Sequence, residues 1–170
     1  MSKIFVNEIA TNGQQLKMPA GMVIQTVSLA STSGITRTQT ASNTYVATGL
    51  SQSITPKFAN SKLDVRLAVT GNTNQADGNP EGFYITFFRK IGSGSFSNIR
   101  TTTNENGIGN LYNRYSRTHA PMLLEIMDAP NTTSEVTYKL YIRTIENSAD
   151  VEIPPGTEEH VEFIIQEISQ

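Results

Sequence analysis

The stretch Lys62-Leu63-Asp64-Val65-Arg66-Leu67-Ala68-Val69 decides the fold class, because its apolar residues recur at every second position. The apolar side chains that share one face of this extended segment are Leu63, Val65, Leu67 and Val69. Asp64 and Arg66 point to the opposite face. A period of two is typical of a strand with one buried face and one solvated face.

The segment 135–143 repeats this pattern further along the chain. Its inward residues are Val136, Tyr138, Leu140 and Ile142, and its outward residues are Lys139, Tyr141 and Arg143. The sequence therefore predicts a second strand of the same kind.

Weaker alternation predicts strands in seven other segments: residues 22–30, 44–48, 50–55, 82–91, 111–117, 120–128 and 161–169. Clusters of Gly, Asn, Pro and Ser at 71–80 and 92–95 are typical of turns between strands. No segment has a sustained helical period. The pattern predicts an all-β fold, an antiparallel two-sheet sandwich of jelly-roll or Greek-key type.

Length and composition exclude several classes of protein. A chain of 170 residues fits one domain. A net charge of −2 with 16% charged residues gives no basic stripe for phosphates, so we expect no nucleic-acid partner. The chain has no cysteine, which removes thiolate nucleophiles and cysteine metal ligands. No segment has the roughly 18 apolar residues of a membrane helix, so we expect no membrane insertion.

Residues 1–20 differ from the remainder and are predicted to form an N-terminal arm that anchors the domain 21–170 to a larger assembly. The apolar residues that would make this contact are Ile4, Phe5, Val6 and Ile9. The alternative is that this segment is an edge strand of the same sandwich. The first eight residues contain no apolar core of an export signal, so we expect the protein to be made in the cytoplasm.

Two predicted strands are apolar on both faces. Phe83, Ile85 and Phe87 alternate with Tyr84 and Phe88. The residues 122–127 likewise alternate two apolar sets. This pattern favours burial of the second face between subunits, and the alternative is a central strand covered by loops.

The richest candidate binding segment is 111–119, where aromatic side chains alternate with Arg and Asn. Its candidate partner- or receptor-binding residues are Tyr112, Arg114, Tyr115 and Arg117. Such side chains stack on sugar rings or anchor protein interfaces. The alternative is that the tyrosines merely cover the sheet.

Catalytic and metal-binding patterns are weak. His119 and His160 are the only histidines, and neither lies beside a nucleophile motif, so we expect no hydrolase triad and no enzyme. The segment 77–81 begins like a calcium loop but lacks the later ligands, and a turn explains it better. Glu158, Glu159, His160 and Glu162 are explained more simply by a solvated edge than by a metal. We expect no metal and no cofactor. A pair of glycosidase carboxylates is not identifiable from sequence, because their separation is spatial.

Six segments follow one another in an order shared with a known family and cover most of the chain: residues 1–9, 19–25, 44–56, 60–63, 127–138 and 163–168. Among these are Pro19-Ala20-Gly21-Met22 and Met127-Asp128-Ala129-Pro130-Asn131. Together they resemble small virion proteins and fibre-tip domains of marine and freshwater bacteriophages, cyanophages included. The segments 71–91 and 101–117 are not shared with the family.

The resemblance implies a β-sandwich, usually trimeric, carried on the capsid exterior or on tail fibres. We therefore expect a homotrimeric virion structural protein that contacts other capsid or tail proteins. A capsid decoration or head-fibre protein is slightly preferred, because the chain shows no shaft, repeat or coiled coil. The alternative is a tail-fibre or spike tip that binds a host surface glycan.

Overall fold

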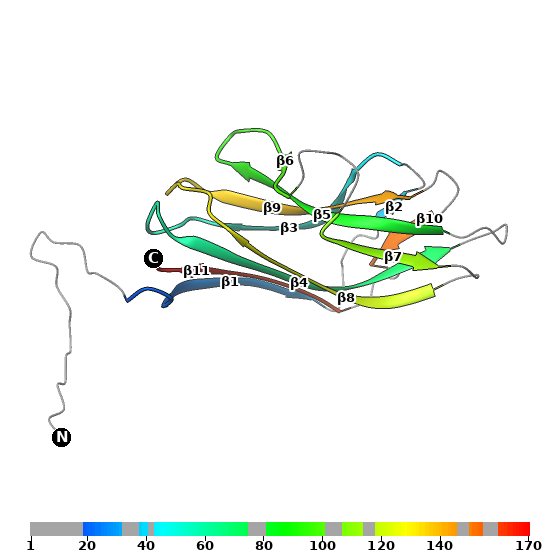
Figure 1. The fold of residues 1–170 in the computed structure, drawn as a ribbon, viewed down its shortest axis with the longest axis horizontal. Coiled ribbons are helices and arrows are strands. Elements are labelled where there is room, and N and C mark those ends of the chain that lie inside the picture. Colours follow the sequence, from blue (N-terminus) through cyan, green and yellow to red (C-terminus); the bar gives the residue numbers. More distant parts are fainter. Residues whose placement is uncertain are drawn as a thin grey trace, which may run out of the picture.

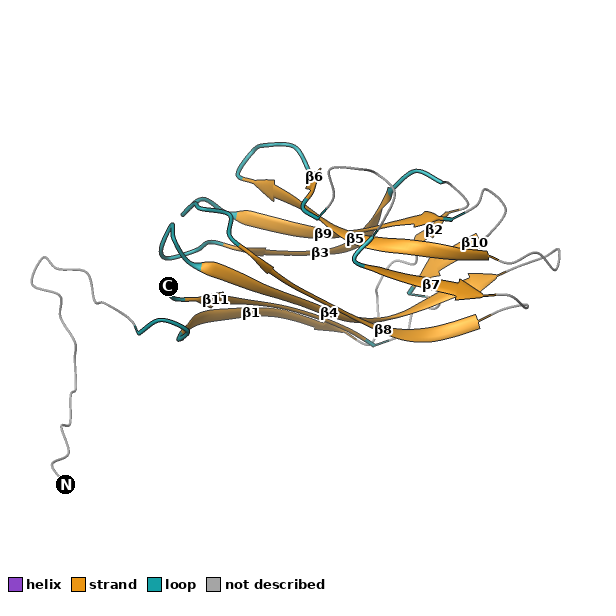
Figure 2. Ribbon diagram, in the orientation of Figure 1, coloured by secondary structure: helices purple, strands orange, loops and turns teal. Residues whose placement is uncertain are grey.

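The computed structural model describes residues 19–31, 38–40, 43–74, 81–100, 107–113, 118–145, 150–154 and 160–170. Within these ranges the chain consists of strands and loops, with no helix (Figure 2). The strands are β1 Val23–Ser31, β2 Thr38–Thr40, β3 Val46–Ile54, β4 Lys62–Asn74, β5 Glu81–Ile91, β6 Ser97–Asn98, β7 Gly109–Asn113, β8 Thr118–Asp128, β9 Val136–Thr144, β10 Asp150–Ile153 and β11 Val161–Ile168.

The strands form two antiparallel sheets that pack face to face (Figure 1). Sheet A has the order β1-β11-β4-β10-β2, with β8 on the other side of β4. Sheet B has the order β3-β9-β5-β6, with β7 also pairing with β5. The eight main strands thus run β1-β11-β4-β8 in one sheet and β3-β9-β5-β7 in the other, which is the strand order of a jelly roll. The predicted two-sheet sandwich is confirmed.

The core lies between the inner faces of the two sheets. All eight apolar residues assigned inward in segments 62–69 and 135–143 are at most 4% exposed. They pack with Phe83, Ile85 and Phe87 of β5 and with Phe163 of β11. Residues of strictly alternating sequence therefore occupy the faces that their period predicts.

Two polar networks close one end of the sandwich. In the first, Arg89 of β5 donates from Nη1 to both carboxylate oxygens of Asp128, at 2.8 Å each. The buried Tyr138 of β9 donates from its hydroxyl to Asp128 at 2.6 Å. Because Asp128 ends β8 of sheet A, this carboxylate connects the two sheets.

In the second network, the buried Glu167 carboxylate accepts hydrogen bonds from the backbone N–H groups of Lys57 and Phe58 and from Gln25. Burial by itself raises the pKa of Glu167, but these hydrogen bonds outweigh it and lower the pKa. The carboxylate is therefore ionised in the folded protein at neutral pH.

The segment 19–22 joins the domain beside the end of β11. Gly21 N–H donates to the Ser169 carbonyl at 2.9 Å, and the Ser169 hydroxyl donates to the Pro19 carbonyl. The predicted arm strand and its candidate anchors Ile4, Phe5, Val6 and Ile9 lie outside the described residues. The predicted function of the arm therefore remains a prediction.

Several predicted boundaries were wrong. The segments 44–48 and 50–55 form one strand, β3, whose register shifts between Ala47 and Ser51. The glycine and asparagine cluster expected to turn at 71 instead extends β4 to Asn74, because β8 and β10 pair with it there. The short strands β2, β6 and β10 were not predicted, since two to four residues show no period.

Asp64 corrects a second expectation. It lies on the outward face of β4, as predicted, but it is only 4% exposed. Arg66 lies beside it, with its Nη2 at 2.6 Å from the carboxylate, and the neighbouring strands place Gln166 and Met127 on either side. The outward face of a strand therefore need not be solvated.

Candidate binding surface

The outer face of sheet B carries a row of aromatic and cationic side chains, which we call the aromatic–cation strip. Alternation in β5 and β9 places them outward, since the inward positions of both strands hold the core. Its members are Tyr45, Tyr84, Phe88, Lys90, Phe96, Tyr112, Lys139, Tyr141 and Arg143. All but Tyr112 are partly buried.

Four of the six rings of the strip form a continuous series of contacts. Phe88 stacks on Tyr141 with ring centroids 3.8 Å apart. Tyr45 meets Phe88 edge-on at 5.8 Å, and Phe96 lies 6.3 Å from Tyr141. These arrangements are favourable for aromatic pairs, so neighbouring rings hold one another in place.

The cations of the strip lie over rings. Arg143 is 4.6 Å from the ring centroid of Tyr84 and 5.4 Å from that of Tyr45. Lys139 and Lys90 lie 5.0 Å and 5.4 Å from the ring of Phe96. Cation–π attraction thus fixes three positive charges along the surface.

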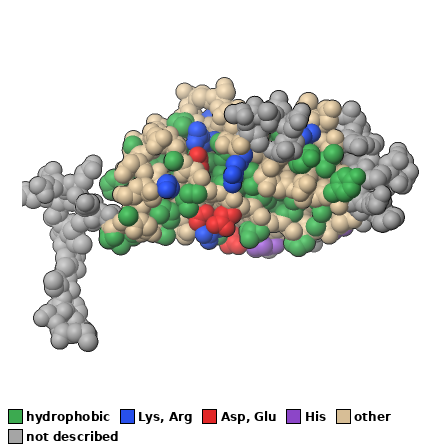
Figure 3. Space-filling model, in the orientation of Figure 1, with side chains coloured by type: hydrophobic (Ala, Val, Ile, Leu, Met, Phe, Trp, Pro, Cys, Tyr) green, Lys and Arg blue, Asp and Glu red, His purple; other side chains and the backbone are tan. Residues whose placement is uncertain are grey.

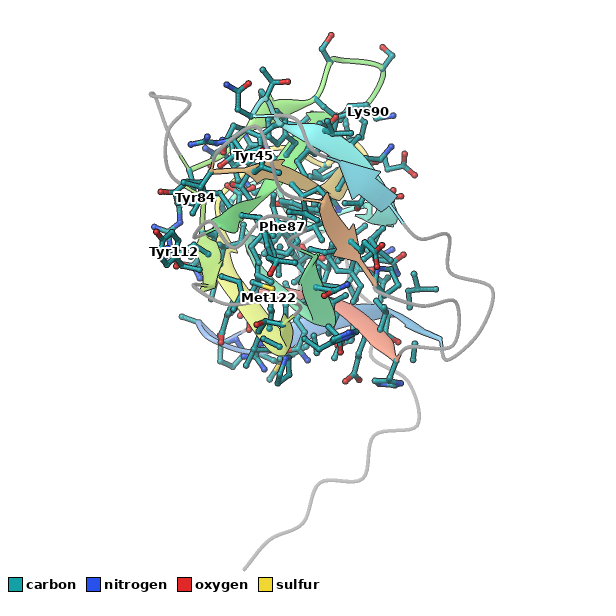
Figure 4. The ribbon with its side chains drawn as sticks, turned by 90° about the vertical axis from the view of Figure 1, so that its right-hand side faces the viewer. Tyr45, Tyr84, Phe87, Lys90, Tyr112 and Met122 are labelled. Atoms are coloured by element: carbon teal, nitrogen blue, oxygen red, sulfur yellow. The ribbon has the colours of Figure 1, made fainter. Side chains whose placement is uncertain are left out.

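Tyr112 extends the strip onto β7. Its partner in β5 is Gly82, which occupies an outward position next to Tyr84 along the strand. A Cβ added at Gly82 would lie 3.0 Å from Tyr112 Cδ2 and 2.5 Å from the Leu111 carbonyl, so the ring packs close to a strand that has no side chain there. Tyr112 is nevertheless 59% exposed. It is therefore the most accessible ring of the strip, and Figure 4 shows it below Tyr84 along one side of the sandwich, with Phe87 inside.

Two phenols of the strip stay protonated at neutral pH. Burial raises the pKa of Tyr45, against the opposing effect of the neighbouring Arg143 guanidinium. Burial also raises the pKa of Tyr141. Both hydroxyls therefore keep the proton with which they can donate a hydrogen bond, although the Tyr45 hydroxyl is buried.

The strip contains one of the four predicted binding residues. Tyr112 was predicted, whereas Arg114, Tyr115 and Arg117 lie outside the described residues. Tyr84, Phe88 and Tyr141 were recognised as outward residues but not as a site. Phe96 and Tyr45 lie outside the strands. Tyr45 was placed in the predicted strand 44–48, but neither residue was predicted to belong to a site.

The outer face of sheet A has a different character. Leu123 and Met127 of β8 are 74% and 57% exposed, and we call these two residues with Arg66, Asp64 and Glu125 the sheet A patch. Arg66 lies 2.6 Å from Asp64 and 3.4 Å from Glu125, so it forms ion pairs with both carboxylates. In Figure 3 most acidic side chains in view gather along the lower sheet beside a histidine, and most Lys and Arg lie over the upper one.

The remaining candidates lie apart from both surfaces or outside the description. His119 is exposed on the outward face of β8, and His160 is exposed just before β11. Residues 77–80, Glu158 and Glu159 lie outside the described residues. Among the residues that are described, no three His, Asp or Glu side chains gather as metal ligands. No helix in the described part of the chain is long and apolar enough to cross a membrane.

The fold and its surfaces define an all-β jelly-roll sandwich with two chemically distinct outer faces. No model of a known protein family matches the chain, and no curated protein matches its sequence.

Proposed function

We propose that this chain is a non-enzymatic structural protein of a bacteriophage particle, present as a homotrimer on the particle exterior. A capsid decoration or head-fibre protein is preferred, and a tail-fibre or spike tip is the alternative. The jelly-roll order supports the proposal, because this sandwich recurs in viral capsid and lectin domains. The sequence segments that resemble small phage virion proteins support it independently.

The observation that carries the assembly proposal is the exposure of Leu123 and Met127. They lie four residues apart on one face of β8, which is the edge strand of sheet A. Large apolar side chains exposed together on a soluble domain mark interaction sites. Arg66 and Glu125 beside them supply both signs of charge, so copies that meet here around a three-fold axis can pair opposite charges.

The two faces of the sandwich do not serve a closed trimer equally. The outer faces of sheets A and B point in opposite directions (Figure 1). If the outer face of sheet A in one copy contacted the outer face of sheet B in the next, the contact would repeat along a line and give an open stack of copies. A closed ring of three copies therefore uses only one of the two outer faces. Meeting through sheet B would bring Lys90, Lys139 and Arg143 of three copies together. Like charges oppose such contact, so we assign the trimer to the sheet A patch.

This assignment revises the expectation that both strands with two apolar faces, β5 and β8, bury their second face between subunits. The second face of β5 is covered largely by the rings of the strip itself, whereas that of β8 stays exposed. Only the second of these strands then supports burial between subunits.

A labelled antibody against the chain, applied to purified particles in the electron microscope, tests the location. Label over the capsid exterior is expected. Label confined to fibre tips would favour the alternative. Particles that contain no label, while their other structural proteins are detected, would overturn the virion proposal.

A further inference from the structure

The aromatic–cation strip has a charge pattern that the trimer proposal does not use. The register assigns eleven residues to outward positions of β5, β7 and β9, and among them are Lys90, Lys139 and Arg143 but no Asp or Glu. Strand β3 contains no acidic residue at all. Within these described strands the outer face is therefore purely cationic, although the chain as a whole carries a net charge of −2.

Two of these cations form a cation–π contact with a ring rather than an ion pair with a carboxylate. Lys90 and Lys139 both approach Phe96, and among the described residues neither forms an ion pair. A cation held by a ring keeps its charge available for an anion. The strip therefore presents two positive charges that converge on one point of the surface.

Polar groups surround the rings. Thr137 of β9 and Ser53 of β3 share a hydrogen bond of 2.9 Å between their hydroxyls on this face. Asn110 is exposed beside Tyr84, and Tyr112 offers a ring that is 59% exposed. An accessible ring next to an amide group suits a ligand with an apolar C–H face and a polar edge, and the hydroxyl pair offers further polar contacts beside Lys90.

We infer that the aromatic–cation strip binds an acidic saccharide, a sugar chain that bears carboxylate or sulfate groups. The ligand must be a chain of several sugar units, because Gly82, the partner of Tyr112, and Lys90 lie eight residues, or about 26 Å, apart along β5. One sugar ring stacks on Tyr112, and anionic groups of units further along the chain pair with Lys90 and Lys139. The inference deepens the receptor-binding alternative above, and it does not depend on the trimer or on the place of the protein in the particle.

Charge and exposure favour a saccharide over two other anionic partners. A nucleic acid would present a dense row of phosphates, which three cations on an acidic chain neutralise poorly. A protein partner would require several well-exposed apolar anchors, and among the described residues the most exposed aliphatic side chains are Leu123 and Met127 on the opposite sheet.

The test measures binding of the purified full chain by calorimetry. The probes are polygalacturonate and dextran sulfate, with neutral dextran, polyglutamate and an oligothymidylate as comparisons. We expect binding to one or both acidic saccharides that weakens as salt is added. Binding of the first alone indicates carboxylate recognition, and binding of the second alone indicates sulfate recognition.

Variants locate the site. Lys90→Gln with Lys139→Gln should weaken binding about tenfold, which is the effect of losing about 1.4 kcal/mol from two ionic contacts. Tyr112→Ala should weaken it several-fold by removing the stacking ring. Lys62→Gln is the matched control, because Lys62 is exposed on the outer face of sheet A. Unchanged melting of each variant shows that the fold is intact.

Three results would overturn the inference. The first is no binding to either acidic saccharide. The second is equal or tighter binding of dextran, polyglutamate or the oligothymidylate. The third is an equal loss in Lys62→Gln and in the strip variants, which would indicate unspecific attraction.

Discussion

The carboxylate of Asp128 should hold the two sheets together, and its loss can be predicted in magnitude. Asp128→Ala removes the acceptor of two hydrogen bonds from Arg89 and one from Tyr138. Removing one partner of a buried ion pair lowers the free energy of unfolding by about 3–5 kcal/mol. The side chains of Arg89 and Asp128 are 24% and 15% exposed, so solvent screening places the expected loss near the lower end, at about 3 kcal/mol.

Removal of the Tyr138 hydroxyl alone should cost less. Tyr138→Phe leaves the Arg89–Asp128 pair intact and keeps the ring in the core, so we expect a loss of about 1 kcal/mol. Because both changes act on the same carboxylate, the double variant should lose less than the sum of the two, by about 1 kcal/mol.

Urea unfolding followed by far-ultraviolet circular dichroism, at one protein concentration, measures these losses. Glu135→Ala is the control, since Glu135 is an exposed acid in the turn before β9 and should change stability by no more than about 0.5 kcal/mol. If Asp128→Ala is no more destabilising than this control, the carboxylate does not join the sheets. If the double variant shows strict additivity, Tyr138 and Asp128 are not coupled.

Three further predictions concern the core, the acid range and the arm. Leu67→Ala should lower the free energy of unfolding in urea by about 2–5 kcal/mol, because Leu67 is fully buried; a smaller loss would contradict its place in the core. The pKa of Glu167 is lowered in the fold, so its contribution to stability is present above its ordinary value of 4.5 and is lost as the pH falls through the lowered value. Glu167→Gln should therefore be less stable than the natural chain at pH 7 and should lose less on acidification, and parallel pH profiles in urea would refute this. Removal of residues 1–18 should leave melting unchanged but abolish attachment to particles that lack the protein, whereas full attachment of the shortened chain would assign anchoring to the sandwich.

The fold class was predictable because apolar and polar residues alternate strictly in β4 and β9. In an extended strand this alternation decides which side chains face the core. Strand ends were less predictable where pairing overrides composition. Gly71 and Asn72 are residues that favour turns, yet both lie in β4 because β8 pairs with this part of it. Local propensity is weak beside a row of hydrogen bonds to neighbouring strands.

The candidate site was predictable only in part, for a spatial reason. Tyr112 could be named from its aromatic and basic surroundings. Tyr84 and Arg143 are 59 positions apart and become neighbours only through the pairing of β5 with β9. Phe96 lies in a turn, and no periodicity gives the direction of a side chain there.

The separation of roles between the two outer faces is tested most directly by the mass of the protein in solution, measured by light scattering at micromolar concentration. The natural chain and the variant with Lys90→Gln and Lys139→Gln should both have three times the chain mass of 18.6 kDa. The variant with Leu123→Ser and Met127→Ser should have the mass of a single chain. A monomeric natural chain, or a trimer lost through the lysine variant and kept by the Leu123 and Met127 variant, would contradict the account.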